Sequence, residues 1–328
     1  MAELPGYLKE LKSLAEEDLK KALEVGEVDV LRRAMAHIPL SGGKRLRPVA
    51  VMLGAEAFGG RPEDVLPLAT AVELIHCFTL VHDDIMDQDS LRRGVPTVHT
   101  LWGVNTAINA GDALFALAFE QLPRLDIPGE RLKRVLRLIA GSVRKVAEGQ
   151  QMDLNFESSE DVDFDSYLRM VELKTAYLFM ASFVGGAIAA GADEDGERRA
   201  REFSRSLGVA FQIQDDLLDI LADEKMLGKD RYSDIRQGKR SLPIIKALEM
   251  LSPEDARWLK DLLSREEKEE ADVKRGAEMI VECGAVEMCR KLMLEHYAVA
   301  EELIESFPNP PARKHIRELV DFLRVREL

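Results

Sequence analysis

The chain has 328 residues, of which 46% are hydrophobic, so it has enough apolar material for a large buried core. Its formal net charge of −14 argues against a general affinity for nucleic acid, because such affinity depends on basic surface. No run of roughly 18 uncharged apolar residues occurs, so we predict neither a membrane-spanning helix nor stable membrane insertion.

The N-terminus and the cysteines indicate the compartment. Met1 to Pro5 has neither the basic nor the apolar region of a secretory signal. Cys77, Cys283 and Cys289 show no metal-binding spacing such as CxxC. We therefore expect a cytoplasmic protein whose thiols are reduced.

Helical periodicity dominates the chain. Leucines recur every three to five residues from Leu8 to Leu23, and the pattern predicts further helices over 48–58, 65–86, 105–122, from Ser252-Pro253 onward and over 315–325. The helix over 105–122 is apolar on nearly every face and is expected to be buried all round. Loops are predicted over 39–44, 90–97, 157–165 and 227–240, and no segment alternates convincingly like a strand. An all-α fold in a single domain over 1–328 follows.

Two acidic clusters with the same spacing stand inside apolar helical stretches. The first is Asp83-Asp84-Ile85-Met86-Asp87 and the second is Asp215-Asp216-Leu217-Leu218-Asp219. Residues four apart share one face of a helix, so the first and last aspartates of each cluster are expected to converge. Converging carboxylates on a buried helix are costly unless a cation lies between them. Oxygen ligands of this kind suit Mg²⁺, which favours a few carboxylates plus substrate phosphates.

Three basic segments accompany the acidic clusters. Gly42-Gly43-Lys44-Arg45-Leu46-Arg47-Pro48 joins two glycines to a helix start, where backbone N–H groups favour an anion. Arg92-Arg93 follows Asp87 by five residues. A third segment has glycine beside lysine twice, at Gly228-Lys229 and Gly238-Lys239, which suits a lid that grips phosphate oxygens.

Each of these features has an ordinary structural explanation. One DDxxD can arise by chance among 59 acidic residues. Arg92 and Arg93 can pair with nearby aspartates at the surface, which is the commoner fate of such charges. His76 on an apolar helix is more often a hydrogen-bonded core residue than a ligand-binding one. Chance does not readily explain all of these features in this order, and their joint occurrence favours a functional site.

Six motifs follow one another along the chain: GGKRLRP (42–48), HDDIMDQDSLRRGVPTVH (82–99), EGQQMDL (148–154), ELKTA (172–176), FQIQDDLLD (211–219) and GKDRYSDIRQGKRSLP (228–243). In these motifs and their order the chain resembles the trans-isoprenyl diphosphate synthases, and most of all the archaeal-type short-chain geranylgeranyl and farnesyl diphosphate synthases. The motifs span about residues 40 to 245. Ser241 departs from the family pattern, which often has threonine there, but it keeps the hydroxyl group.

The resemblance implies an isoprenoid synthase-type all-α bundle around a deep central cavity, in a homodimer. It also implies two or three Mg²⁺ ions per active site, held between two facing acidic clusters. The implied metal ligands are Asp83, Asp84, Asp87 and Asp215, with Asp216 and Asp219 in support. The metal ions would bridge to an allylic diphosphate.

The resemblance implies two anion sites as well. The residues implied to bind the allylic diphosphate are Arg92, Lys174, Lys229 and Lys239, with Thr175 and Gln212 near the reacting carbon. Those implied to bind isopentenyl diphosphate are Lys44, Arg47, His76 and Arg93. The reaction breaks an allylic C–O bond, and the double bond of isopentenyl diphosphate attacks the resulting cation. Metal ions and fixed cations stabilise the charge that develops on the departing pyrophosphate.

Phe78 is a candidate determinant of product length. It lies five residues before Asp83, about 7.5 Å along a helix, where its ring would form a floor beneath the growing chain, while the neighbouring Thr79 leaves more room. The ordinary alternative is that Phe78 is a core residue. An aromatic residue here, with no insertion inside DDIMD, resembles the pattern of geranylgeranyl diphosphate synthases, which make a C20 product. Farnesyl diphosphate would be an intermediate or co-product.

Four alternative functions share parts of this sequence pattern. A farnesyl or longer-chain synthase differs only in product length. A class I terpene cyclase shares the fold and the first acidic motif, but it has no use for a second anion site. A non-catalytic synthase subunit tends to lose one acidic motif, and both are present here. A structural helical protein predicts no Mg²⁺-dependent ligand binding. The preferred allylic primer is not readable from these motifs.

Overall fold

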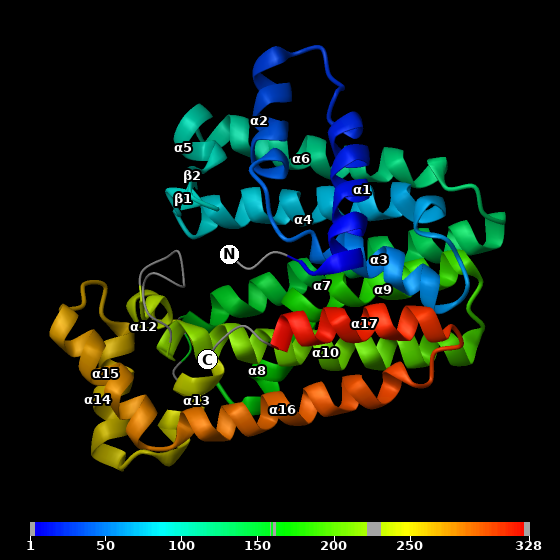
Figure 1. The fold of residues 1–328 in the computed structure, drawn as a ribbon. Coiled ribbons are helices and arrows are strands. Elements are labelled where there is room, and N and C mark those ends of the chain that lie inside the picture. Colours follow the sequence, from blue (N-terminus) through cyan, green and yellow to red (C-terminus); the bar gives the residue numbers. More distant parts are fainter. Residues whose placement is uncertain (1–3, 158, 160–161, 222–230, 325–328) are drawn as a thin grey trace. The chain divides into compact units, whose positions relative to one another are not determined.

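A computed structural model describes residues 4–157, 159, 162–221 and 231–324, and almost every element in it is a helix (Figure 1). The helices, in chain order, are α1 (Gly6–Ala22), α2 (Asp29–Leu40), α3 (Leu46–Ala57), η1 (Pro62–Val65), α4 (Leu66–Met86), α5 (Val98–Trp102), α6 (Val104–Gln121), η2 (Leu122–Arg124), α7 (Gly129–Glu157), α8 (Phe164–Val171), η3 (Glu172–Ala176), α9 (Tyr177–Ala190), α10 (Glu194–Leu221), α12 (Ser233–Gln237), α13 (Leu242–Met250), α14 (Pro253–Ser264), α15 (Glu270–Glu282), α16 (Ala285–Ile304) and α17 (Pro310–Arg324). Two short strands, β1 (Leu91–Arg92) and β2 (Val95–Pro96), form an antiparallel pair. The all-α expectation is confirmed.

The chain forms two compact units, which we describe separately. Unit 1 comprises residues 1–143, 178–201 and 304–319, and unit 2 comprises residues 144–177, 202–303 and 320–328. The first acidic cluster belongs to unit 1 and the second to unit 2. The single domain over 1–328 stays a prediction.

The core of unit 1 is built around α4, which packs against α1, α3 and α6. Its sequence is apolar on most faces, and this composition is typical of a helix surrounded by other helices. Close approach between α3 and α9 depends on glycine, because a Cβ atom at Gly54 would lie 2.0 Å from the carbonyl oxygen of Phe183. Helices α3 and α9 therefore meet at backbone contact.

Three local differences from the sequence-based expectation appear. Helix α6 is not buried all round, because Val104 and Ile108 are exposed beside a row of exposed polar residues spaced four and three residues apart (Asn105, Asn109 and Asp112). The predicted loop over 90–97 contains the β1–β2 pair. The predicted loop over 227–240 contains the short helix α12.

Two helical stretches are long and apolar enough to cross a membrane by length and composition, Pro62–Met86 and Phe164–Ala190. In the apolar window of each, 61% and 78% of the residues are buried inside the protein. Core helices of water-soluble proteins meet the same criteria, so these stretches are weak evidence for membrane insertion.

Unit 2 contains α8, η3, most of α10 and the helices α12 to α16. Its core includes the fully buried rings of Tyr167 and Tyr297. The Tyr297 hydroxyl donates a 2.7 Å hydrogen bond to the side chain of Gln214 on α10. Gln214 immediately precedes the second acidic cluster, so this buried contact helps to fix the rotation of α10 at that point.

Candidate active site

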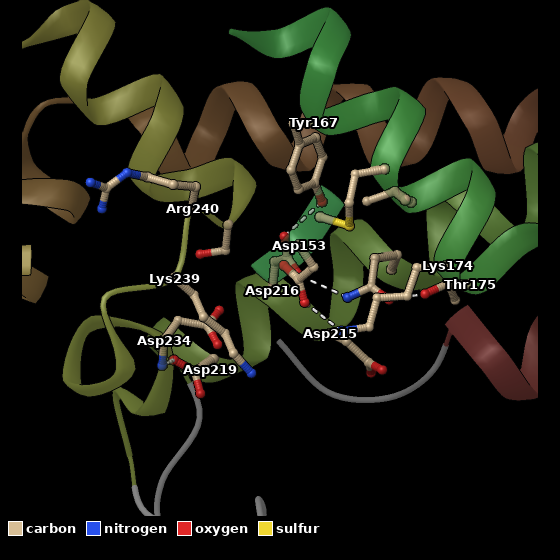
Figure 2. A pocket seen from close by; sticks show the side chains of 14 residues that line it. Asp153, Tyr167, Lys174, Thr175, Asp215, Asp216, Asp219, Asp234, Lys239 and Arg240 are labelled. Carbon is tan, nitrogen blue, oxygen red and sulfur yellow. Dashed lines mark hydrogen bonds and ion pairs between the residues drawn. The ribbon is translucent and has the colours of Figure 1, made fainter. Parts of the chain in front are cut away.

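A cavity of about 190 Å³ in unit 2 contains the second acidic cluster (Figure 2). It is lined by residues of α7, α8, η3, α10 and the segment that follows α10: Asp153, Tyr167, Met170, Val171, Lys174, Thr175, Gln212, Asp215, Asp216, Asp219, Asp234, Lys239, Arg240 and Ser241. The structure thus gathers four motifs from separate parts of the sequence. In the close view, Arg240 extends away from the carboxylates, whereas Lys239 extends toward Asp219.

The Asp216 carboxylate accepts three hydrogen bonds from other parts of the protein. It accepts from the side-chain amide of Gln212 at 2.9 Å, from the Tyr167 hydroxyl at 2.6 Å and from the backbone N–H of Leu242 at 3.0 Å. Burial raises the pKa of Asp216 to about 6, although these three hydrogen bonds oppose the shift. Asp216 therefore joins α8, α10 and α13, in keeping with a supporting role.

Asp219 is also satisfied by the protein itself. Its side chain accepts from the backbone N–H of Ser233 at 3.2 Å, from the Ser233 hydroxyl at 2.5 Å and from the backbone N–H of Asp234 at 3.0 Å. These donors lie in the first turn of α12, where N–H groups have no partner within the helix. Asp219 is only 1% exposed. It anchors the segment that returns to the cavity after α10.

Lys174 and Thr175 enter the cavity from η3 and contact two different helices. The Lys174 ammonium pairs with the Asp153 carboxylate on α7. The Thr175 hydroxyl donates to the Gln212 side-chain oxygen on α10 at 2.9 Å. Because Gln212 also donates to Asp216, a continuous hydrogen-bonded path runs from Thr175 to the acidic cluster.

Of the two lysines in the last basic segment, Lys239 lies within the described residues and Lys229 does not. Lys239 lines the cavity, and its backbone N–H donates to the Asp234 carbonyl at 2.9 Å. Asp234 is itself held by Asp219, so the placement of Lys239 depends on that aspartate. Lys229 lies outside the described residues.

The first acidic cluster closes α4 in unit 1. Asp84 is fully buried, while Asp83 and Asp87 are half-buried. Arg92 pairs with Asp84 Oδ1 and lies 3.4 Å from Asp89. The pKa of Asp84 is raised by burial, although the Arg92 guanidinium opposes that shift. Arg92 thus pairs with the cluster itself rather than being a purely solvated charge.

The donor chemistry of the clusters fits a hard divalent cation. Asp84 Oδ2 is buried and accepts no hydrogen bond from the described residues. A buried carboxylate oxygen in this condition is costly unless a cation or a donor binds it. No group of three or more His, Cys, Asp or Glu side chains within residues 4–157, 159, 162–221 and 231–324 is arranged to hold a metal alone. An ion that takes a few carboxylates plus substrate phosphates needs no such cage.

A cluster of cationic residues surrounds His76 in unit 1. Arg47 donates to His76 Nε2 at 3.2 Å. Burial lowers the pKa of His76 well below its usual value of 6.5, and the charges of Arg47 and Arg93 lower it further. Arg93 bonds the carbonyl oxygens of Ile38 and Gly42, and its guanidinium packs on Gly43. The structure therefore brings together Arg47, His76 and Arg93, beside the loop that carries Lys44.

Arg45 fixes this loop, a role that the sequence did not reveal. It adopts the left-handed conformation, with φ of 54°, at the start of α3. Its guanidinium is buried and bonds the Glu73 carboxylate at 2.6 Å, the Pro39 carbonyl and Glu16. The left-handed turn at Arg45 thus lies between Lys44 and Arg47 and is held by buried contacts of the Arg45 side chain.

Phe78 is half-buried and lies in a short row of aromatic rings. Its ring centroid is 5.2 Å from that of Phe115 on α6, and Phe115 is 5.1 Å from Phe119. The ring of His82, one turn along α4, also contacts Phe78, with the two ring centroids 4.9 Å apart. The row runs between α4 and α6, beneath the first acidic cluster on α4.

Sequence reasoning missed several residues that the structure places at these sites. Asp153 stands inside the EGQQMDL motif, which was a usable signal for the partner of Lys174. Tyr167 and Glu73 have no local signature, because their partners lie 49 and 28 residues away. No local sequence feature indicates the left-handed conformation of Arg45 either, because arginine rarely adopts it.

A family model and several known proteins match this chain over most of its length. The polyprenyl synthetase family model matches residues 28–280. The short chain isoprenyl diphosphate synthase of Methanothermobacter thermautotrophicus is 38% identical over 327 residues, covering 100% of both chains. The geranylgeranyl pyrophosphate synthase of Geoglobus acetivorans is 41% identical over 320 residues, covering 98% of both chains.

Solved structures agree. The crystal structure of geranylgeranyl pyrophosphate synthetase from Pyrococcus horikoshii matches with a TM-score of 0.91 at 39% identity, covering 98% of both chains. A relative with another product name, geranylfarnesyl diphosphate synthase of Aeropyrum pernix, is 37% identical over 90% of this chain and 92% of its own. With a family model that matches most of its length and such relatives over nearly all of it, the chain belongs to the polyprenyl synthetase family.

Proposed function

We propose that this prenyltransferase condenses isopentenyl diphosphate with the allylic diphosphates dimethylallyl, geranyl and farnesyl diphosphate, and that its main product is geranylgeranyl diphosphate. The observation that carries the proposal is the cluster of Arg47 and Arg93 around the neutral His76, none of which belongs to the set proposed to bind the allylic diphosphate. A second anion site is what a condensing enzyme needs and a terpene cyclase does not.

The family is a class of prenyltransferases that uses a divalent metal, and we propose that the metal is Mg²⁺ in two or three copies. Asp83, Asp84, Asp87 and Asp215 would hold it. The buried Asp84 oxygen without a donor among the described residues supports this set, and so does the place of Asp215 in the lining of the cavity. Bound metal would supply positive charge to a leaving diphosphate.

The protein's own cations complete the allylic diphosphate site in this proposal. Lys174 and Lys239 line the cavity, Arg92 pairs with Asp84, and Lys229 belongs to the set by its motif. When the allylic C–O bond breaks, negative charge grows on the leaving oxygens. Fixed ammonium and guanidinium groups stabilise this charge more in the transition state than in the ground state. Lys174 would exchange its contact with Asp153 for the diphosphate.

Thr175 and Gln212 would act on the carbon side. Their hydrogen bond fixes two oxygen dipoles at the cavity wall, where they can stabilise an allylic cation without reacting with it. The proposed reaction needs no covalent nucleophile. Exclusion of water is essential, because water would capture the cation.

The second substrate would bind through its diphosphate to Lys44, Arg47, His76 and Arg93. The lowered pKa keeps His76 neutral near pH 7, so its ring can orient Arg47 without adding charge. The pinned loop between Pro39 and Arg45 supports this assignment, because Lys44 then starts from a fixed backbone.

Product length, assembly and compartment are parts of the same proposal. Phe78, backed by Phe115, would block the tail at C20. A homodimer is supported by the exposed apolar residues of α5 and α6, Leu101, Val104 and Ile108. We place the enzyme in the cytoplasm on the sequence evidence alone. The name of the Aeropyrum relative makes a C25 product the main alternative.

The test is to incubate the purified protein with Mg²⁺, isopentenyl diphosphate and each of the three allylic diphosphates, and to size the products by mass spectrometry. We expect elongation of every primer with accumulation of the C20 diphosphate. A C15 or C25 end product would correct the assigned length. The synthase assignment itself would fall if no primer were elongated.

A further inference from the structure

Lys174 and Thr175 lie in an unusual element, the π-helical turn η3 between α8 and α9. Such a turn holds an extra residue compared with an α-helical turn, and so it shifts the direction of the side chains within it. Here Lys174 contacts Asp153 on α7, and the next residue, Thr175, contacts Gln212 on α10. Both side chains lie at the cavity in Figure 2.

Two glycines on the flanking helices lie against the backbone of η3. A Cβ atom at Gly149 on α7 would lie 2.3 Å from the Lys174 nitrogen and 2.7 Å from its Cα. A Cβ atom at Gly208 on α10 would lie 2.8 Å from the Ala176 Cβ and 3.0 Å from its Cα. Real side chains do not approach so closely, so η3 occupies space that only these glycines leave open.

Both glycines are buried inside long helices, where glycine is less favourable than alanine. No turn or left-handed backbone requires them there. Because the two glycines have no side chain, they permit the close approach of η3. A further contact holds the first residue of η3, because Arg205 on α10 donates to the Glu172 carboxylate at 2.6 Å.

We propose that Gly149 and Gly208 are positioning residues for the reaction. By admitting the backbone of η3 they place the Lys174 ammonium at the leaving diphosphate and the Thr175 hydroxyl near the reacting carbon. The inference rests on the proposed function for the roles of those two groups. Added methyl groups would push η3 outward and separate both side chains from their partners together.

The test compares Gly149→Ala and Gly208→Ala with Gly141→Ala. Gly141 lies on α7, and a Cβ atom there would meet nothing within 4 Å. We expect each of the first two variants to lose about 10²-fold in kcat/KM for the allylic diphosphate, the effect of misplacing a catalytic group by about 1 Å. The KM for isopentenyl diphosphate should stay within about twofold, and Gly141→Ala should match the parent protein.

A rescue variant separates positioning from general damage. In Ala176→Gly/Gly208→Ala the methyl group moves from one side of the contact to the other, which relieves the closest clash. We expect this variant to recover most of the activity that Gly208→Ala loses. Wild-type kinetics in both single variants, or a folded rescue variant as slow as Gly208→Ala, would overturn the inference.

Crystal structures of the same variants distinguish failure of this inference from failure of the proposed function. If the parent protein elongates no allylic diphosphate, the catalytic roles fail. The positioning inference is then judged by the contacts of Lys174 with Asp153 and of Thr175 with Gln212. These contacts should be lost in Gly149→Ala and kept in Gly141→Ala. Their survival in Gly149→Ala would refute it.

Discussion

The guanidinium of Arg45 donates to the carboxylate of Glu73 at 2.6 Å, and both side chains are only 3% exposed. The pair joins the start of α3 to the middle of α4. Arg45 stands between Lys44 and Arg47, two residues assigned to the second diphosphate site. If Lys44 and Arg47 bind the second diphosphate as proposed, this one buried ion pair connects the stability of unit 1 with the geometry of substrate binding.

Removing one partner of this pair should be costly. We expect Glu73→Ala to lower the free energy of unfolding by about 3–5 kcal/mol, because the buried guanidinium of Arg45 loses its buried ionic partner. Glu16→Ala is the control, since Glu16 is 38% exposed and lies 3.3 Å from Arg45; its loss should be below about 1 kcal/mol. Urea unfolding of both variants checks this. Equal losses of unfolding free energy in the two variants would show that the buried Glu73 contributes no more to stability than the partly exposed Glu16.

Replacing both partners tests the link to binding. Arg45→Met/Glu73→Leu removes the charges together, so the unfolding free energy should change little. The loop loses its anchor at the Pro39 carbonyl as well. We therefore expect the KM for isopentenyl diphosphate to rise by about tenfold or more, with an unchanged KM for the allylic diphosphate. An unchanged KM for both substrates would remove Arg45 from the positioning of Lys44 and Arg47.

Asp215 and Asp219 should behave as opposites, although one motif contains both. Asp219→Ala removes three hydrogen bonds from the start of α12 and should cost about 1–3 kcal/mol of stability. Asp215→Ala should abolish most turnover with a clearly smaller loss of stability. Thermal melting combined with steady-state kinetics distinguishes the two effects. The assignment of Asp219 as an anchor fails if its variant melts at the parent temperature.

Phe78→Ala should lengthen the product. The ring occupies space between α4 and α6, and its removal opens room for at least one more five-carbon unit. Phe119→Ala is the matched control, because in the described part of the chain its ring contacts Phe115, which stands between it and Phe78 in the row. We expect the first variant to make diphosphates longer than C20 and the second to keep the parent product. An unchanged product from Phe78→Ala would exclude the ring as the floor.

His76 should make folding sensitive to mild acid. Its folded pKa is well below 6.5, so the unfolded chain binds a proton that the folded protein does not as the pH falls below about 6.5. Stability from this source is present above that pH and decreases below it, by about 1 kcal/mol between pH 7.5 and pH 5.5. His76→Gln should lack this component. His296, whose pKa burial also lowers, is common to both proteins and cancels in the difference. A constant difference between the two proteins across this pH range would contradict the assignment.

Short-range patterns predicted the all-helical fold, whereas the cluster of Arg47, His76 and Arg93 was predicted only through the family resemblance, because Arg47 and His76 are 29 residues apart. DDxxD on a helix, GGKRLRP before a helix and paired lysines are local features. The sequence did not predict that Asp216 and Asp219 are satisfied by the protein, since their donors Tyr167, Leu242 and Ser233 are 14 to 49 residues away. Nor did the sequence predict the partial exposure of α6, because the alanine and leucine residues of this helix outnumber the residues of its polar row.

The proposed function requires that the first and second acidic clusters act on the same leaving diphosphate, and a double-mutant comparison of Asp84→Ala and Asp215→Ala tests this most directly. The rate of pyrophosphate release from farnesyl diphosphate with isopentenyl diphosphate and Mg²⁺ is measured for each single variant and for the pair. Groups that act as a unit are strongly non-additive. We predict that each single variant loses about 10³-fold or more and that the double variant is hardly slower than the slower single one. Losses that multiply, or near-normal release in either single variant, would contradict the account.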